Sequence, residues 1–449
     1  MPVLPTKTAT PVLVPLAVRI EALNGLMGMV QPIPAEWLGG AAATVKQPKA
    51  GLACTPCNNY NTLVQAWRKA LKWTDGLDCA LSVMLASVTS TMQVGDQLWV
   101  KIIGPASCGK STLCEALSVN DKYILAKSTI RGFHSGYKSD RDGTEDNSLI
   151  VQVRNKTLIT KDGDTILQSP NLGQILSDAR DLYDCTTRSH YKNKMGKDYV
   201  GVRMTWILCG TSSLRSIDSS ELGERFVDCV VMEGIDDDLE DEILWRVANR
   251  ADRNMAVLAN GDVTTNYEPE LALAMGLTGG YVDWLRENAS QLLAQVQMNE
   301  THLRLCTRLG KFVAYMRARP SKQQDENSER EFAARLVSQH TRLAKCLAVV
   351  LNRPVDDEVM RRTTKVALDT ARGQTYKIAD HLYRAVGGLE TRALALYTNN
   401  TEDKTRTLLR FLRQIGVVEL GEASTTGMSK QPKWVLTARL RALFSEIEG

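Results

Sequence analysis

The feature that most constrains this chain is a glycine-rich turn, Gly104-Pro-Ala-Ser-Cys-Gly109-Lys110-Ser111, which matches the pattern G-x-x-x-x-G-K-[ST]. An apolar run, LWVKIIG, leads into the turn, and a helical pattern, TLCEAL, follows it. Glycines allow backbone N–H groups to curl around an anion, and the N-terminus of the following helix favours negative charge. The sequence therefore predicts a phosphate-binding loop between a strand and a helix.

The chemistry of such a loop assigns roles to its residues. Lys110 would reach the β- and γ-phosphates of ATP, and the Ser111 hydroxyl would hold Mg²⁺. We therefore predict ATP and Mg²⁺ as cofactors. The residues predicted to surround the nucleotide are Gly104, Pro105, Ala106, Ser107, Cys108, Gly109, Lys110, Ser111 and Thr112.

Short apolar runs alternate with helical patterns around this loop. The runs LWVKIIG, YILAKS, KTLITKD and RMTWILCGT are strand candidates, which predicts an α/β fold with a mostly parallel sheet. The expected domains are a proline-rich arm or small irregular domain at 1–59, a helical lead-in and ATPase core at 60–235, a helical domain at 236–387, and a winged-helix-like tail at 388–449.

Composition excludes several classes of protein. Hydrophobic residues make up 43% of the 449 residues and charged residues 24%, as in a globular protein with more than one core. No apolar run is long enough to span a bilayer, so we expect no membrane partner. The ten cysteines lie singly except for Cys54 and Cys57, which could form half a zinc site but lack a second pair. We expect a reduced, cytoplasmic protein.

Two carboxylates follow the apolar run KTLIT, where a P-loop enzyme needs a metal ligand and a group that activates water. Asp162 is the predicted Mg²⁺ ligand. Asp164 would either polarise the attacking water or cap the helix that follows. The surrounding residues depart from a plain Walker B motif, because Lys161 precedes Asp162 and Gly163 follows it.

The apolar run RMTWILCGT ends in small polar residues, of which Thr211 is the predicted contact to the γ-phosphate or to water. Further along, Arg225 stands between an acidic turn and an apolar run. An arginine there could stabilise transition-state charge on a neighbouring subunit's nucleotide. The alternative is a surface salt bridge with Glu221 or Glu224.

The order of these motifs, GPASCGKST, KTLITKDGD, TWILCGT and GERF, followed by a helical segment, resembles that of the AAA+ ATPases. Within that class the chain looks like the branch of the MCM helicases and of related viral and plasmid replication ATPases. The segment RLVSQHTRLAKCLAVVL, with Arg335 and Arg342, is similar to the sensor 2 helix of that branch. On this resemblance Arg335 is the sensor 2 arginine, and an AAA+ core, a helical lid and a winged helix are expected.

That branch also inserts a β-hairpin into the central channel of its ring. Here the segment CTTRSHYKNKMGKDYVGVRM occupies the corresponding stretch, with a Met-Gly turn and an aromatic residue among basic ones, as expected of a tip that grips a phosphate backbone. A plain solvated hairpin is the alternative. The predicted DNA contacts are Arg188, His190, Lys192, Lys194 and Lys197.

Two further polar regions could touch nucleic acid. The first is the loop KSTIRGFHSGYKSDRDGTEDNSL, which is either an ordinary exposed loop or a second channel loop. The second is the tail, where a winged helix would meet phosphates. The residues concerned are His134, Tyr137, Lys138 and Arg141 in the loop, and Arg406, Arg410, Arg413, Lys430 and Lys433 in the tail.

The leading hypothesis from the sequence is an ATP-hydrolysing homo-oligomer, a hexameric ring that moves on single-stranded or forked DNA as a replicative helicase of a phage or mobile element. The chief alternative is an AAA+ switch or loader that acts on DNA or on a partner protein without processive unwinding. A third is a winged-helix DNA-binding protein whose nucleotide site is regulatory.

Overall fold

The structure is a computed structural model that describes residues 52–134, 146, 148–190, 196–216, 225–232, 237–258, 268–318, 320, 332–421 and 432–448. Residues Leu52–Gly449 form one compact unit. Most of the predicted N-terminal arm, 1–51, lies outside the described residues. The domain boundaries predicted at 59, 235 and 387 stay predictions.

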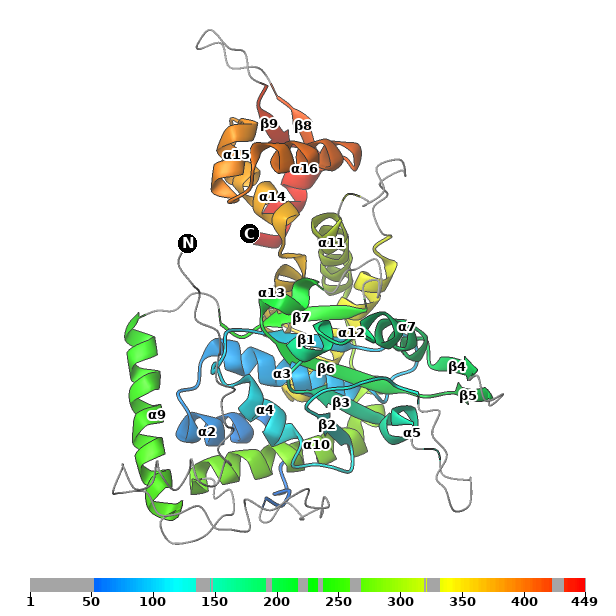
Figure 1. Cartoon of the computed structure of the whole chain (residues 1–449), viewed down its shortest axis with the longest axis vertical. Helices are drawn as coiled ribbons and strands as arrows, with labels where there is room; N and C mark the ends of the chain where they lie inside the picture. Colours follow the sequence, from blue (N-terminus) through cyan, green and yellow to red (C-terminus); the bar gives the residue numbers. More distant parts are fainter. Residues whose placement is uncertain are drawn as a thin grey trace, which may run out of the picture. The chain divides into compact units, whose positions relative to one another are not determined.

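A five-stranded parallel sheet forms the centre of the unit, in the order β2-β3-β6-β1-β7 (Figure 1). The α/β fold and the parallel sheet expected from the sequence are therefore confirmed. The strand cores are buried on both faces, which explains their almost continuous apolar runs. The strands are β1 (Trp99–Ile103), β2 (Ile124–Lys127), β3 (Lys156–Thr160), β6 (Met204–Gly210) and β7 (Phe226–Val230).

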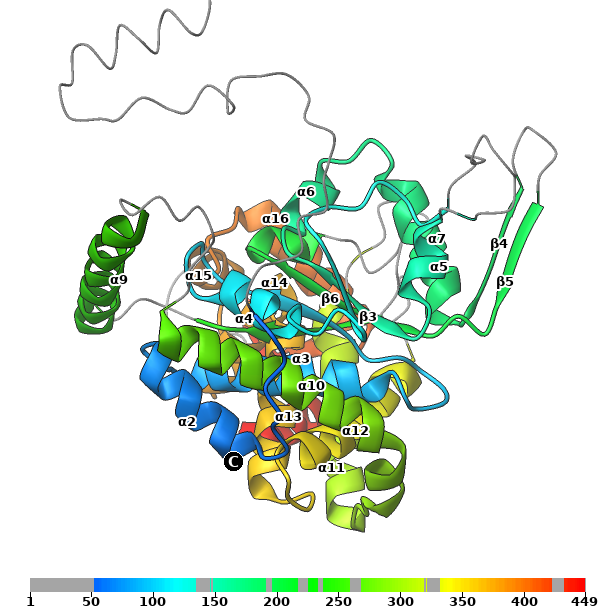
Figure 2. The same cartoon turned by 90° about the horizontal axis from the view of Figure 1, so that it is seen from below.

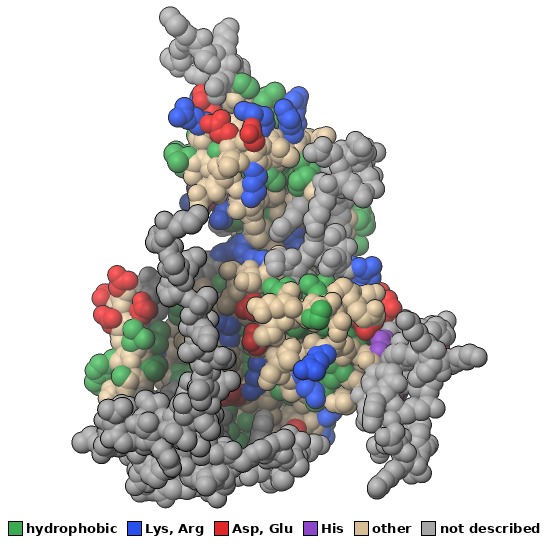
Figure 3. All heavy atoms as spheres, in the orientation of Figure 1, with side chains coloured by type: hydrophobic (Ala, Val, Ile, Leu, Met, Phe, Trp, Pro, Cys, Tyr) green, Lys and Arg blue, Asp and Glu red, His purple; other side chains and the backbone are tan. Residues whose placement is uncertain are grey.

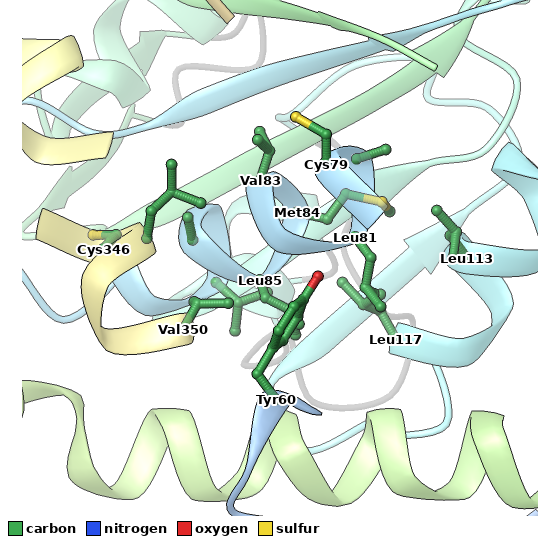
Figure 4. Close-up of a cluster of buried hydrophobic side chains, with 14 of the residues drawn as sticks. Tyr60, Cys79, Leu81, Val83, Met84, Leu85, Leu113, Leu117, Cys346 and Val350 are labelled. Carbon is green, nitrogen blue, oxygen red and sulfur yellow. The ribbon is translucent and has the colours of Figure 1, made fainter. Parts of the chain in front are cut away.

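Successive side chains of each strand enter two different cores, as the pleat requires. Val100 and Ile102 of β1 face a core built with helices α2, α3, α4, α10 and α12, part of which is shown in Figure 4. Trp99 faces a second core, rich in aromatic rings, under α5, α6 and α7. These helices are α2 (Tyr60–Ala70), α3 (Asp75–Ser90), α4 (Lys110–Leu117), α5 (Leu149–Val153), α6 (Asp164–Leu167), α7 (Leu172–Tyr183), α10 (Pro269–Gln295) and α12 (Ala334–Val350).

A two-stranded hairpin lies in the chain between β3 and β6, where the sequence predicted one. Strands β4 (Thr186–His190) and β5 (Gly196–Val200) pair antiparallel, with Thr186 opposite Val200. Figures 1 and 2 both show the hairpin extending away from the five-stranded sheet. The hairpin is thus an arm attached to the core that surrounds the five-stranded sheet.

The segment after β7 is helical, as predicted. Two of its helices, α10 and α12, pack in the same core as the lead-in helices α2 and α3. Part of the helical segment therefore packs against one face of the five-stranded sheet. The other helices of this segment are α9 (Asp237–Leu258), α11 (Glu300–Arg317), α13 (Asp357–Ala371) and α14 (Gln374–Arg384). None of the helices in the described parts of the chain could span a membrane.

The C-terminal elements follow the predicted order of two helices, a ribbon and a helix. They share a third core with α11 and α14, which includes Phe312 and Phe444. The name winged helix stays a proposal for this arrangement. Its elements are α15 (Thr391–Tyr397), α16 (Glu402–Gln414), the antiparallel strands β8 (Val418–Leu420) and β9 (Trp434–Leu436), and α17 (Ala438–Glu448).

Candidate functional site

The glycine-rich turn joins the end of β1 to the start of α4. Ser107 and Gly109 both adopt positive φ, at 64° and 90°. Gly109 is the N-cap of α4, and a Cβ built there would lie 3.0 Å from Leu77 Cδ2. Glycine is therefore required at this position for both its backbone conformation and its space. The turn brings the unpaired N–H groups of the first turn of α4 to the carboxyl end of the sheet, which suits an anion.

Lys110 points back over the turn. Its Nζ donates to Gly104 O at 2.8 Å and to Pro105 O at 2.5 Å, and it lies 3.4 Å from Cys108 Sγ. The ammonium group is thus inside the curve of the loop. Lys110 therefore lies where a cation that binds phosphate is needed.

Strand β6 lies between β1 and β3 and joins the loop to the predicted carboxylates. Gly104 N donates to Gly210 O at 3.2 Å, and Thr211 follows at the end of β6. Thr211 N in turn donates to Asp164 Oδ2 at 2.9 Å. The structure therefore brings the loop, Thr211 and Asp164 together at one edge of the sheet.

Two roles are open to Asp164 from the sequence, water activation and helix capping, and its contacts argue against capping. The N-cap of α6 is Gly163, without a side-chain cap, and the Asp164 carboxylate accepts from Thr211 N instead of capping its own helix. Its second oxygen, Oδ1, is buried and has no hydrogen-bond partner among the described residues. A buried carboxylate oxygen without a donor is costly, so this atom fits a polar ligand such as a water or a hydrated metal ion.

Gly163 explains why the motif departs from the Walker B pattern. Its N donates to Cys209 O at 2.7 Å, and a Cβ there would lie 2.6 Å from Leu208 Cδ1. Only glycine allows the chain after β3 to approach β6 this closely. Lys161, the other departure, pairs with Glu115 of α4 at 3.3 Å and so leaves the carboxylates uncovered.

The predicted metal ligands are a hydroxyl and a carboxylate at the same edge of the sheet. Ser111 is exposed in the first turn of α4, and Asp162 is exposed just after β3. Oxygen ligands of this kind fit Mg²⁺, which proteins commonly hold with one or two side chains plus the substrate's phosphates. In the chain as described, no cluster of three His, Cys, Asp or Glu residues could hold a metal alone, and this includes Cys54 and Cys57.

A cavity of about 610 Å³ lies beside the loop, where α13 approaches the end of β7. Val231 lines it, and the Val231 Cβ is 3.5 Å from the position of a Cβ on Gly104. Gly76, also in the lining, precedes the Leu77 that contacts Gly109. The cavity has the size of a small-molecule site. Its lining is Gly76, Val230, Val231, Arg361, Thr364, Lys365, Leu368, Asp369, Arg372 and Ile447.

Helix α13 supplies the polar wall of this cavity and also covers the free edge of β7. Asp369 Oδ2 accepts from Val230 N at 2.8 Å and from Lys365 Nζ at 2.6 Å, and Thr370 Oγ1 accepts from Asp228 N at 2.8 Å. Burial raises the pKa of Asp369, and Lys365 opposes that rise. Sequence reasoning missed these residues. Arg361, Lys365 and Arg372 are spaced so that they share one helix face. That spacing is the signal in the sequence that could have indicated a cationic wall here.

Arg225 and Arg335 lie at the amino ends of the sheet's strands, whereas the phosphate loop lies at the carboxyl ends. The guanidinium of each lies over the ring of Tyr183, at 5.4 Å and 5.7 Å from its centroid. Tyr183 packs edge-on against Trp99, the first residue of β1, whereas the loop follows the last residue of that strand. Neither arginine can therefore reach the phosphate loop of the same chain.

Arg225 is buried, with a side-chain exposure of 7%. Its Nη2 lies 3.3 Å from Asp184 Oδ2, and burial lowers its pKa. The predicted salt-bridge partners, Glu221 and Glu224, lie outside the described residues, and the described partner is Asp184. To stabilise charge on the nucleotide of a neighbouring subunit, as the sequence predicts, Arg225 would have to break its ion pair with Asp184. Arg342 instead holds the turn after α3, through a 2.6 Å hydrogen bond from Nη2 to Val94 O.

The predicted nucleic-acid contacts are only partly covered by the structure. The backbone of Arg188, His190 and Lys197 lies in the β4–β5 hairpin, while Lys192 and Lys194 lie outside the described residues. The His134 side chain is 7% exposed and lies 3.8 Å from Asp178, which argues against a contact with nucleic acid at this residue.

Other predicted contacts divide in the same way. The tail arginines Arg406, Arg410 and Arg413 are exposed on α16, and Arg406 pairs with Asp403. Residues outside the described set are Tyr137, Lys138, Arg141 and Lys430.

No protein-family model matches this chain, and no curated protein matches it. Among solved structures it is similar to the crystal structure of a "putative ATPase" from Cytophaga hutchinsonii, with 11% sequence identity and a TM-score of 0.41. The match covers 78% of this chain and 93% of the other. A likeness of that degree does not assign the chain to a family.

Proposed function

We propose that this protein binds and hydrolyses ATP at the carboxyl edge of its parallel sheet. The observation that carries the proposal is the chain of contacts from the loop holding Lys110, through Gly210 and Thr211, to the buried and unpartnered Asp164 Oδ1. A cationic phosphate cradle thus faces a carboxylate that is held in place by a backbone amide. Phosphoryl transfer to water needs these two elements.

Each residue of the proposed ATP site has its own role in binding or hydrolysis. The loop amides and Lys110 bind and orient the phosphates, and Asp164 accepts a proton from, or orients, the attacking water. Thr211 fixes Asp164 through its backbone N–H. Ser111 and Asp162 would hold Mg²⁺, which when bound neutralises charge on the phosphates. The nucleoside extends from the loop into the cavity lined by Val231 and α13.

We further propose that the protein acts as a homo-oligomer, a hexameric ring of AAA+ type. Arg225 and Arg335 lie at the edge opposite the loop, so they could serve only the site of another subunit. Helix α9 adds support, because Leu244, Trp245 and Val247 are 55%, 71% and 54% exposed after an acidic first turn. In Figure 3, hydrophobic side chains lie on the surface where Figure 1 places α9. Exposed apolar side chains in such a group are typical of a protein interface.

DNA is the proposed substrate of the motor, which would act on single-stranded or forked DNA as a replicative helicase of a phage or mobile element. The hairpin extending from the core supports this proposal, because basic residues dominate the sequence of its tip and backbone phosphates attract them. The same hairpin would transmit movement between subunits to the DNA.

A loader or switch is the second candidate, and one observation favours it. Arg225 is engaged with Asp184 and Tyr183 in its own subunit, as expected of a protein that completes its active site only when it assembles. Strand displacement on a forked duplex distinguishes the two functions, because a loader hydrolyses ATP without unwinding.

The first test is steady-state ATP hydrolysis and ATP binding, with and without single-stranded DNA. Lys110→Ala should abolish binding. Asp164→Asn keeps an acceptor for Thr211 N, so it should retain binding and lower the rate by about 10²- to 10⁴-fold. Lys122→Ala, which removes an exposed lysine paired with Glu287, is the matched control. Hydrolysis that survives Lys110→Ala would overturn the proposal.

A further inference from the structure

The C-terminal helix reaches the cavity beside the phosphate loop. Ile447, in the last turn of α17, lines the cavity together with Val230 and Val231 from the end of β7 and Leu368 from α13. Ile447 is buried, with 9% exposure. One wall of the cavity therefore comes from an element more than 300 residues along the chain from the phosphate loop.

Contacts on two other helices fix the position of this last turn. Glu446 Oε2 lies 2.9 Å from Arg308 Nε of α11, and the Ser445 and Tyr383 hydroxyls are 3.2 Å apart. Arg441 donates to two backbone carbonyls at the end of α14, Leu382 O and Tyr383 O, at 3.0 and 2.9 Å. These contacts with α11 and α14 hold the last turn of α17, and with it the apolar side chain of Ile447, at the cavity.

The lining has the chemistry of a nucleoside site. Val231, Leu368 and Ile447 offer apolar surface to a flat base, while Thr364 and Lys365 offer polar groups suited to ribose hydroxyls. A nucleoside attached to phosphates in the loop would pass Val231 first, since Val231 lies next to Gly104. Ile447 would then be the contact supplied by the C-terminal elements.

We infer that α17 closes the nucleoside cavity and that Ile447 is a nucleotide-positioning residue. The inference rests on the proposed ATP site. It has a consequence for regulation: whatever binds the ribbon β8–β9 or α16 and displaces α17 changes nucleotide affinity without touching the phosphate loop. Nucleotide binding changes the affinity of the C-terminal elements for that ligand by the same factor.

The test compares two ligands in the full-length protein by isothermal titration calorimetry. Mg²⁺-ADP contains the nucleoside, whereas Mg²⁺-tripolyphosphate occupies only the phosphate loop. Ile447→Ala should raise the Kd for ADP about tenfold, the usual scale for lost apolar contact in a pocket, and leave tripolyphosphate binding unchanged. In hydrolysis assays it should raise the KM for ATP and leave kcat unchanged.

Two further variants keep the test decisive. Leu443→Ala removes a half-buried side chain of the same helix that does not line the cavity, so it should leave both affinities unchanged. Ile447→Trp fills the cavity without creating a void, and it should block ADP while tripolyphosphate still binds. It therefore decides the question even if Ile447→Ala unfolds the helix.

The outcomes separate the two proposals. Unchanged ADP affinity in both Ile447 variants, or an equal loss of ADP and tripolyphosphate, overturns the role of Ile447. If Lys110→Ala binds both ligands as the wild type does, the proposed ATP site itself fails. If Lys110→Ala loses both ligands while only ADP responds to Ile447, both proposals are supported.

Discussion

His340 gives the protein a quantitative pH dependence that can be worked out from its burial. The side chain lies in α12 with 0% exposure, and neither ring nitrogen has a hydrogen-bond partner among the described residues. Burial lowers the pKa of His340 from its ordinary 6.5 to about 4. The folded protein therefore keeps this imidazole neutral at pH values where the unfolded chain protonates it.

The sign and size of the effect follow from linkage. Between pH 6.5 and pH 4 the unfolded state binds more protons at this site, so the free energy of unfolding falls as the pH falls. At 1.36 kcal/mol per pKa unit the full loss is about 3 kcal/mol, of which about 2 kcal/mol is reached by pH 5. Well above pH 6.5 the imidazole is neutral in both states, so His340 makes no pH-dependent contribution there.

The measurement is urea unfolding followed by tryptophan fluorescence, for the wild type and His340→Leu at pH 7.5 and pH 5. Other titrating groups affect both proteins equally, so the variant should lose about 2 kcal/mol less than the wild type between these pH values. His381→Leu, at a half-buried histidine stacked on Tyr397, is the control and should follow the wild type. If His340→Leu loses as much stability as the wild type, the buried neutral imidazole is not the cause.

Three more predictions follow from single contacts. Gly76→Ala should lower the melting temperature by several degrees, because its Cβ would lie 1.7 Å from a backbone carbonyl oxygen at the end of β7, whereas Gly173→Ala, with nothing within 4 Å, should not. Asp369→Ala should cost about 1–3 kcal/mol of unfolding free energy, because it leaves the buried Val230 N without its acceptor and removes the partner of the partly exposed Lys365; Asp369→Asn should cost less, and equal losses would contradict this reasoning. Trp245→Ser should reduce the oligomer fraction in mass photometry at unchanged melting temperature, and an unaltered mass distribution would exclude α9 from the interface.

The sheet and the loop could be predicted because their signals are local. The apolar runs around Val100, Leu158 and Ile207 required burial on both faces, and the spacing of Gly104, Gly109 and Lys110 required a turn around an anion. These patterns depend on neighbours in the sequence. The structure accordingly contains the strands and the loop where the sequence placed them.

The contact between Asp164 and Thr211 could not be predicted, because the two residues lie 47 positions apart and follow different strands. A sequence pattern shows an acidic residue at a helix start, where capping is the ordinary interpretation. Only the adjacency of β3 and β6 shows that the carboxylate faces Thr211. The same limit explains why the Ile447 contact was missed, since nothing local in α17 indicates a cavity.

The arginines show a different limit. The sequence pattern of α12 identifies Arg335 as a sensor 2 arginine by resemblance. That pattern does not show whether a helix end approaches the amino or the carboxyl ends of the sheet's strands. The structure places Arg335 beside Arg225 and Tyr183 at the amino edge, while α13 approaches the loop. Cations on α13, which the sequence analysis did not single out, are therefore the ones near the proposed nucleotide of the same subunit.

The walls of the cavity differ in how they are attached to the loop. Helix α13 is hydrogen-bonded to β7 through Asp369 and Thr370, and Val231 N at the end of β7 donates to Ile103 O of β1 at 2.8 Å. A shift of α13 would break these bonds, so this wall and the loop move together. The ion pair and hydrogen bonds of the last turns of α17 go to α11 and α14 instead, and its packing against α13 is apolar. Ile447 is therefore the part of the lining through which an event at the C-terminal elements can alter nucleotide binding while the loop stays in place.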